Sequence, residues 1–320
     1  MSLVAVASAK GAPGVTTFSV ALAALFGSAP GGLGAGGEPL LADLDPHGGD
    51  VALRYRTDDG KPLDPGVGLL SLTAAIRGGG MPQQPAALVE RHSQRVAGGL
   101  PVLVGVSGPE QAAGVEALWP QLAATLSGTG RPVVADVGRL GPTRSLTPLL
   151  RAADAVLLLA RAELEGLAHL RERVRRLIGG ETDSGELGPG AARRVGVVLV
   201  SNERAVAART EQLLRSGGLP VRVLGTVADD ARGAALLGGG GRAGRTTLVR
   251  SVRTLLPAVH ELVGATATTE LTAGVPGPLA PQPYSMQPPA AHQPAGQQPA
   301  GQQPHPQRGP ETAEIPVVRP

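Results

Sequence analysis

The most chemically informative part of the chain is the run of small residues KGAPGVTT at positions 10–17. The apolar segment before it is typical of a strand, and the segment after it is typical of a helix. A strand that turns into a helix in this way aims several backbone N–H groups at one anion, and the helix adds the positive end of its dipole. Gly11, Ala12 and Gly14 keep bulky side chains out of the turn, and Thr16 falls where a hydroxyl ligand of Mg²⁺ belongs. The run therefore predicts a polyphosphate site with a divalent cation.

Carboxylates follow two other apolar runs of the chain. Asp43 and Asp45 lie in LLADLDPHGGD, and Asp136 lies in RPVVADVGRL. Two carboxylates close together need a cation, so the first pair favours a metal site. An Asp after a strand is also a common helix cap or turn former, and Asp136 taken alone fits either interpretation.

The run at 10–17 departs from the ordinary phosphate-loop pattern G-x-x-x-x-G-K-[ST], which would place Gly at Ala9 and Lys at Val15. It instead resembles the deviant phosphate loop of the MinD/ParA family of ATPases, K-G-G-x-G-K-[ST]-[ST], which begins with an additional lysine. Ala12 and Val15 depart from that pattern. The residues that match it are Lys10, Gly11, Gly14, Thr16 and Thr17.

Further stretches resemble this family in the same order, over roughly residues 1–263. Asp43 and Asp45 match the two carboxylates after the family's second strand, and Asp136 matches the Walker B carboxylate that helps to hold magnesium. Asn202, in VGVVLVSNE, matches a residue that reads the adenine. The segment GTVADD is similar to a strand end near the base, with Ala228 in place of the usual proline.

The resemblance implies ATP and Mg²⁺ as cofactors and assigns a role to each matching residue. Asp45 and Lys10 are the expected catalytic residues, and the metal is expected at Thr16, Asp43 and Asp136. The residues expected to bind the nucleotide are Lys10, Gly11, Ala12, Pro13, Gly14, Val15, Thr16, Thr17 and Asn202.

Val15 stands where the family has the lysine that contacts the β and γ phosphates. Loss of such a charge-assisted contact costs about 1.5–3 kcal/mol for each hydrogen bond, and it harms turnover more than binding. Lys10 is retained, and in the family its counterpart crosses a dimer interface to the partner's nucleotide. We therefore expect an ATP-dependent homodimer with slow or absent hydrolysis. The alternative is that Lys10 bends back into its own site and restores the missing charge.

Composition sets the fold class. The chain of 320 residues is 42% hydrophobic but only 2% aromatic, so its core must be built from Ala, Val and Leu. Strands are expected at 3–8, 39–45, 101–106, 132–137, 155–160, 195–201 and 221–227, and helices at 17–26, 68–77, 115–126, 164–178, 205–216 and 246–263. Such alternation predicts an α/β fold with a doubly wound, mostly parallel sheet of about seven or eight strands and helices on both faces.

The domain organisation follows from changes in composition. Residues 1–264 are expected to form the nucleotide-binding domain, with loops at the glycine-rich segments 27–39 and 238–245. From 265 to 320 the chain is rich in Pro, Gln, Ala and Gly, which predicts a disordered tail. The absence of cysteine, of a signal peptide and of a transmembrane run favours a cytoplasmic protein.

Three functions remain open from the sequence. The first is a nucleotide-dependent switch that positions or assembles an unidentified protein partner in cell division, chromosome partitioning, or secretion or pilus machinery. The second is an active ATPase that binds DNA non-specifically, and the third is a scaffold that binds no nucleotide. The helix at 246–263 is expected to pack on the core, so no direct membrane anchor is predicted. The arginines available for DNA are Arg171, Arg173, Arg175, Arg176, Arg242, Arg245, Arg250 and Arg253.

Overall fold

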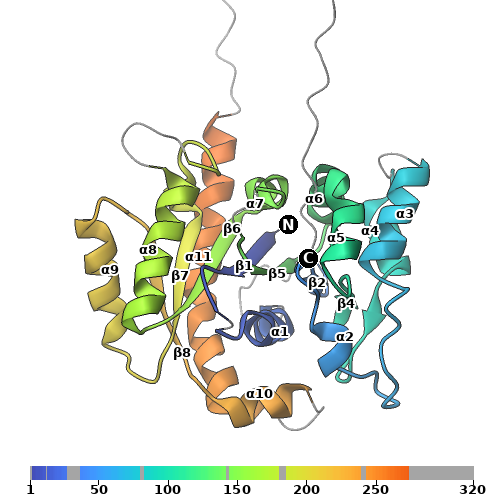
Figure 1. The fold of residues 1–320 in the computed structure, drawn as a ribbon, viewed down its shortest axis with the longest axis horizontal. Helices are drawn as coiled ribbons and strands as arrows, with labels where there is room; N and C mark the ends of the chain where they lie inside the picture. Colours follow the sequence, from blue (N-terminus) through green and yellow to red (C-terminus); the bar gives the residue numbers. More distant parts are fainter. Residues whose placement is uncertain are drawn as a thin grey trace, which may run out of the picture. The chain divides into compact units, whose positions relative to one another are not determined.

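The architecture is built on an eight-stranded sheet with strand order β3-β4-β2-β5-β1-β6-β7-β8 (Figure 1). The computed structural model describes residues 2–11, 13–26, 37–79, 83–141, 144–179, 185–238 and 243–273, with 266–273 by backbone alone. All strand pairs are parallel except β3 with β4. The strands are β1 (Leu3–Ser8), β2 (Leu40–Asp43), β3 (Gln94–Arg95), β4 (Pro101–Leu103), β5 (Val133–Arg139), β6 (Ala155–Arg161), β7 (Val195–Val200) and β8 (Arg222–Val227).

The strands are buried on both faces because helices cover both sides of the sheet. All six residues of β1 are buried, and its side chains alternate between two apolar clusters. Leu3 and Ala5 belong to one cluster, whereas Val4 and Val6 belong to the other. This arrangement confirms the α/β, doubly wound sheet that the uninterrupted apolar runs predict.

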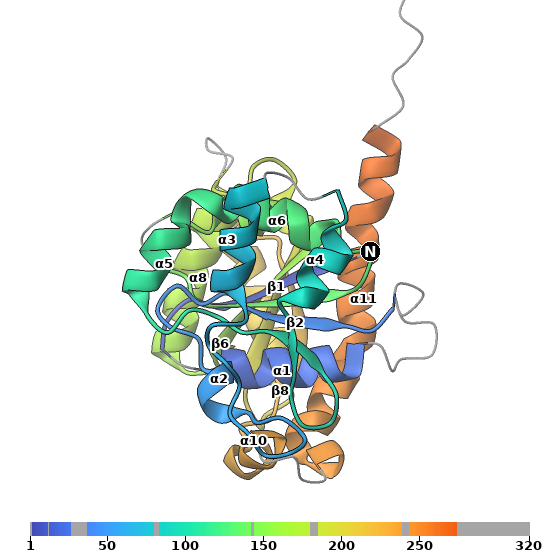
Figure 2. The same cartoon turned by 90° about the vertical axis from the view of Figure 1, so that its right-hand side faces the viewer.

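The helices form two layers. One layer consists of α1 (Val15–Phe26), α2 (Val51–Arg54), α10 (Ala231–Gly238) and α11 (Thr247–Ala273). The other consists of α3 (Leu69–Gly79), α4 (Pro85–Arg91), α5 (Pro109–Val115), α6 (Trp119–Ser127), α7 (Thr147–Ala152), α8 (Leu164–Ile178) and α9 (Val206–Ser216). Figure 2 shows α1 on one side of the strands and α3, α4 and α6 on the opposite side.

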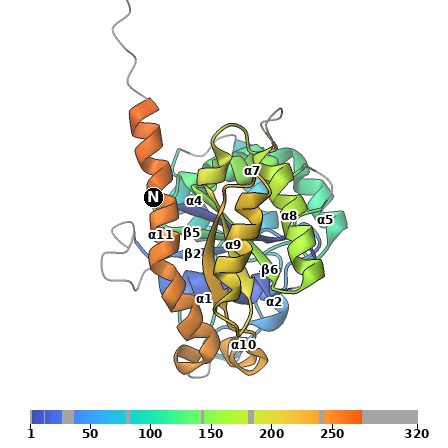
Figure 3. The ribbon, with the colours of Figure 1, turned by 90° about the vertical axis from the view of Figure 1, so that its left-hand side faces the viewer.

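The last helix packs on the core, as the sequence predicts. Its buried side chains include Leu248, Val252 and Val259, which join the apolar cluster of α1. Figure 3 shows α11 on one side of the sheet and α8 and α9 on the other side. The helix runs to Ala273, past the boundary expected at 264, and residues 274–320 lie outside the described part of the chain. Within that described part, we find no helix that combines the length and the apolar character needed to cross a membrane.

Some expected elements are shorter or divided in the structure. The expected strand 101–106 forms only over Pro101–Leu103, and the expected helix at 115–126 is split into α5, a short 3-10 turn and α6. The sequence also misses the short helices α2, α4, α7 and α10 and the antiparallel strand β3. Most of the two glycine-rich segments, 27–36 and 239–242, lies outside the described residues.

Candidate functional site

The candidate site lies where the connections of the sheet change direction. At its carboxyl end β1 leads to α1 in one helix layer, while its neighbour β5 leads to α7 in the other layer. In doubly wound sheets a crevice opens at such a switch point, and ligands bind there. The residues predicted to bind phosphate follow β1, and Asp136 lies on β5, so the topology brings them to one place.

The loop between β1 and α1 has the backbone of an anion-binding turn. Gly11 and Gly14 adopt positive φ values of 71° and 89°, which side-chain-bearing residues rarely adopt. The N–H of Phe18 donates to the carbonyl of Gly14 at 2.9 Å, and this bond closes the first turn of α1. The preceding amides have no acceptor within the helix and remain available to a ligand. Ala12, predicted to bind the nucleotide, lies outside the described residues.

Val15 does not face the loop opening. Its side chain is only 7% exposed and belongs to the apolar cluster of α1, β1 and α11. The position of the missing lysine is therefore filled by a core residue, and Val15 offers the site its backbone amide alone.

Lys10 is exposed and its ammonium group turns toward α8. Its Nζ lies 2.9 Å from the ring nitrogen Nε2 of His169, within hydrogen-bond distance. The alternative in which Lys10 bends back into its own phosphate loop is not the arrangement that the structure has. Lys10 instead lies at the rim of the site, on the side of α8.

Asp43, at the carboxyl end of β2, and Asp136, midway along β5, form a buried pair. The two residues are direct neighbours in the strand register, and each is 1% exposed. One oxygen of Asp43 accepts the N–H of Val51 at 3.2 Å, and one oxygen of Asp136 accepts the N–H of Gly138 at 3.0 Å. The other oxygens, Oδ1 of Asp43 and Oδ2 of Asp136, are buried without a hydrogen-bond partner.

Burial perturbs the protonation of both carboxyl groups. It raises the pKa of Asp43 well above its usual range, and the Asp136 charge raises it further. Burial likewise raises the pKa of Asp136 to about 6, against the opposing effects of the Thr16 hydroxyl and the Gly138 amide. A divalent cation would satisfy both free oxygens and offset the repulsion between the charges.

The donor set fits magnesium bound through few protein ligands. Carboxylate and hydroxyl oxygens are the ligands that Mg²⁺ takes, and Mg²⁺ usually keeps several waters and is completed by substrate phosphates. In the described residues no group of three or more His, Asp or Glu side chains is arranged to hold a metal. The site therefore fits a metal held by Thr16, Asp43 and Asp136 together with a bound phosphate, rather than an all-protein cage.

Asp45 lies against the same strand end. Its carboxylate accepts the N–H of His47 at 2.8 Å and lies 3.2 Å from the His47 ring nitrogen Nδ1. A Cβ at Gly138, whose φ is +61°, would overlap the Asp45 carboxylate, so a glycine permits this close approach. Asp45 is 23% exposed and thus remains accessible beside the buried pair.

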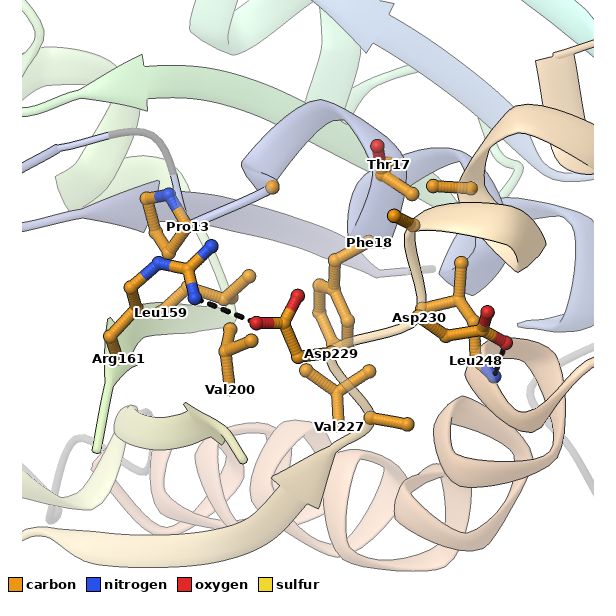
Figure 4. A pocket seen from close by; sticks show the side chains of 14 residues that line it. Pro13, Thr17, Phe18, Leu159, Arg161, Val200, Val227, Asp229, Asp230 and Leu248 are labelled. Atoms are coloured by element: carbon orange, nitrogen blue, oxygen red, sulfur yellow. Dashed lines mark hydrogen bonds and ion pairs between the residues drawn. The ribbon is translucent and has the colours of Figure 1, made fainter. Parts of the chain in front are cut away.

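An open cavity adjoins the loop, with Pro13, Gly14, Thr17 and Phe18 in its wall (Figure 4). Its wall combines apolar side chains with a few charged groups, a composition that is typical of small-molecule sites. A second cavity is lined by Asn202 and shares the segment 228–230 with the first. The structure thus brings Asn202 and the loop to adjoining cavities.

Two side chains at the cavity were not singled out as ligands from the sequence. Arg161, the last residue of β6, makes an ion pair of 2.8 Å with Asp229 across the cavity wall (Figure 4). The sequence feature that could have identified Arg161 is its place at the end of a predicted parallel strand. Asp230 accepts the N–H groups of Gly233 at 2.8 Å and Leu248 at 3.1 Å, so its carboxylate caps the local backbone.

No family model and no curated protein matches the chain. Solved structures do match. A ParA family ATPase from Chlorobium tepidum TLS is similar with a TM-score of 0.60 and 12% identity, covering 81% of this chain and 98% of that one. The septum site-determining protein MinD of Pyrococcus horikoshii OT3, complexed with Mg-ADP, has a TM-score of 0.58 and 15% identity, covering 83% and 98%. A variant of Cyanothece McdA in complex with ATP has a TM-score of 0.52 and 16% identity, covering 88% and 99%.

These likenesses extend over almost the whole length of each compared structure, at sequence identities that carry information on the fold alone. They agree with the α/β topology of the sheet. The chain therefore has the fold of the MinD/ParA family of P-loop ATPases.

Proposed function

We propose that this protein is a MinD/ParA-like switch that binds ATP with Mg²⁺, dimerises on the nucleotide and thereby positions or assembles a protein partner. One observation carries the proposal. The phosphate loop and the two buried carboxylates, each with an unpartnered oxygen, meet at the switch point of the sheet. Such oxygens are costly to bury without a ligand, which supports a cation at this site.

Different parts of the site would bind different parts of the nucleotide. The backbone N–H groups of Gly11, Gly14, Val15, Thr16 and Thr17 would hold the phosphates. The Thr16 hydroxyl with Asp43 and Asp136 would hold the metal. Bound Mg²⁺ supplies positive charge that neutralises the phosphates. Asn202 and the second cavity would take the base, since that cavity continues from the one beside the loop.

Val15 supports a switch rather than a fast enzyme. Its side chain is held in the core, so it supplies no charge where phosphoryl transfer develops negative charge. Lys10 is exposed at the rim and its ammonium contacts only an imidazole side chain among the described residues, so it is free to reach a partner subunit. We therefore infer nucleotide-dependent dimerisation with slow or absent hydrolysis.

Of the eight arginines considered for DNA, three on α8 make internal contacts. Arg173 donates to the carbonyls of Leu140 and Gly141, while Arg175 and Arg176 pair with Glu172. Arg242 lies outside the described residues. These contacts favour the protein-partner function over DNA binding. Within it, cell division, partitioning and secretion or pilus localisation are the processes that fit such a switch.

Two measurements test the proposal together. Calorimetric titration with MgATP should give saturable binding, and light scattering should show a monomer that becomes a dimer when MgATP is added. Lys10→Ala should retain binding but lose the dimer. Lys61→Ala is the matched control, because Lys61 is the only other lysine and is exposed, paired with Asp59. A chain that binds no MgATP, or that loses the dimer equally in both variants, would contradict the proposal.

A further inference from the structure

The phosphate site has a charge deficit that the residues predicted from the sequence do not fill. Val15 is apolar and buried, and the Lys10 ammonium faces His169. Arg161, which lines the cavity, is already paired with Asp229 at 2.8 Å. A bound triphosphate would meet the metal and the loop amides, while the Lys10 ammonium points to His169 and the Arg161 guanidinium is paired with Asp229.

Arg54, at the end of α2, places a guanidinium on the phosphate loop. Its Nη2 donates to the hydroxyl of Thr17 at 2.9 Å. Thr17 is 7% exposed, belongs to the first turn of α1 and lines the cavity beside the loop. The guanidinium therefore lies at the edge of the predicted phosphate site.

The surroundings of Arg54 favour the binding of an anion. Among the described residues no carboxylate lies within ion-pair distance of it, and its one hydrogen bond goes to a neutral hydroxyl. The start of α1 carries the positive end of the helix dipole, which repels a cation. The single bond leaves most of the guanidinium N–H donors unused. Arg56, two residues on, differs because it donates to the carbonyls of Leu53 and Tyr55.

The segment that carries Arg54 is hydrogen-bonded to Asp43, one of the carboxylates proposed to bind the metal. The N–H of Val51, the first residue of α2, donates to Asp43 at 3.2 Å. Tyr55 is 3% exposed and has an unpartnered hydroxyl. Burial raises the pKa of Tyr55 to about 12, the Arg54 charge opposes this shift, and the Asp136 charge adds to it. Residues 51–55 thus lie within electrostatic reach of the same pair whose free oxygens mark the cation site.

We propose that Arg54 is the phosphate-binding cation of this site and takes over the charge that Val15 lacks. A guanidinium presents a planar fork of donors that matches phosphate oxygens, and it needs no change in the loop backbone. The inference rests on the proposed nucleotide function, which it deepens by naming the side chain that recognises the polyphosphate.

A purely structural role for Arg54 makes a different prediction. If the bond to Thr17 only fastens α2 to α1, its loss lowers the stability of the nucleotide-free protein and weakens every ligand to the same degree. If Arg54 binds phosphate, its loss weakens ligands through their phosphates and leaves the nucleotide-free protein almost unchanged.

The test is calorimetric titration of the full chain with Mg-tripolyphosphate and MgATP. Arg54→Gln should weaken both about ten- to a hundredfold, since a hydrogen bond to a charged group is worth that much. Arg54→Lys should lose less, because an ammonium keeps the charge without the fork. Arg91→Gln removes the same charge from the exposed end of α4 and should match the unmodified protein. Melting temperatures without ligand should agree within about 2 °C.

The outcomes separate this inference from the function on which it rests. Affinities of Arg54→Gln within about twofold of the unmodified protein would overturn the role of Arg54 while leaving ATP binding in place. If Arg54→Gln does not fold, Arg54→Lys decides: an affinity equal to that of the unmodified protein overturns the role. An unmodified protein that binds neither probe contradicts both proposals. As a gain-of-function check, Val15→Lys should restore phosphate affinity in the Arg54→Gln background.

Discussion

Replacement of Asp136 by asparagine should stabilise the protein without ligand and abolish its stabilisation by MgATP. Asp136 is 1% exposed, and its Oδ2 has no hydrogen-bond partner. Asparagine keeps Oδ1 as the acceptor for the N–H of Gly138 and places a neutral amide where the charged oxygen was. The substitution therefore removes a buried negative charge beside Asp43 but also removes a ligand of the proposed metal.

The magnitude follows from the protonation of Asp136. Its pKa rises from 3.8 to about 6 on folding. Each unit corresponds to about 1.4 kcal/mol, so the ionised carboxylate destabilises the fold by about 3 kcal/mol at neutral pH. For a domain of this size that corresponds to roughly 6–12 °C in melting temperature.

The pH dependence has a definite sign. Because the pKa of Asp136 is higher in the folded state, the folded state binds its proton more tightly. Its contribution is therefore most favourable below about pH 4 and is lost as the pH rises through about 6. Asp43, whose pKa is also raised, acts in the same direction. The advantage of Asp136→Asn should thus be small near pH 4.5 and largest near pH 7.5.

Thermal unfolding from pH 4.5 to 7.5, with and without MgATP, measures both effects. Asp58→Asn is the matched control, because Asp58 is exposed and also accepts one backbone N–H, from Gly98 at 2.9 Å. It should change neither the pH dependence nor the response to MgATP. An Asp136→Asn protein that is less stable than the unmodified protein at pH 7.5, or that still gains stability from MgATP, would refute the reasoning.

Three further predictions concern the rim and the walls of the site. Val15→Lys should lower the melting temperature of the nucleotide-free protein, because Val15 is packed among apolar side chains. It should also raise ATP turnover. An unchanged rate of phosphate release would contradict the idea that the missing lysine limits hydrolysis. His169→Phe removes the acceptor of the Lys10 ammonium and should strengthen MgATP-dependent dimerisation in analytical ultracentrifugation, so a weaker dimer would count against Lys10 as the bridging residue. Asp230→Ala loses the bonds to the N–H groups of Gly233 and Leu248 and should cost about 1–2 kcal/mol in urea unfolding, an effect that protonation of Asp230 at low pH should mimic.

The fold was predictable where apolar runs are long and uninterrupted. Strands such as Leu3–Ser8 and Val195–Val200 are buried on both faces, so their hydrophobicity alone identifies them. Short elements could not be predicted because tertiary interactions fix them rather than any periodic pattern. The four-residue helix α2 is an example: Val51 is its one buried side chain, and a bond from Val51 to Asp43 anchors it.

The candidate site was predictable in its loop and carboxylates, since these occur in a fixed order at strand ends. Burial of Asp43 and Asp136 together follows from the neighbouring registers of β2 and β5, which only the structure supplies. The orientations of Lys10 and Val15 depend on tertiary packing and were left open by the sequence. Arg54 carried no signal, because its partner Thr17 is 37 residues away along the chain.

The most direct test of the account is a crystal structure of the protein with Mg²⁺ and a non-hydrolysable ATP analogue. The account predicts the triphosphate on the backbone N–H groups of Gly11, Gly14, Val15, Thr16 and Thr17. It also predicts a metal ion beside Thr16, Asp43 and Asp136, and the guanidinium of Arg54 on a phosphate oxygen. Saturating analogue with no density at the loop, or density with the metal elsewhere, would contradict it.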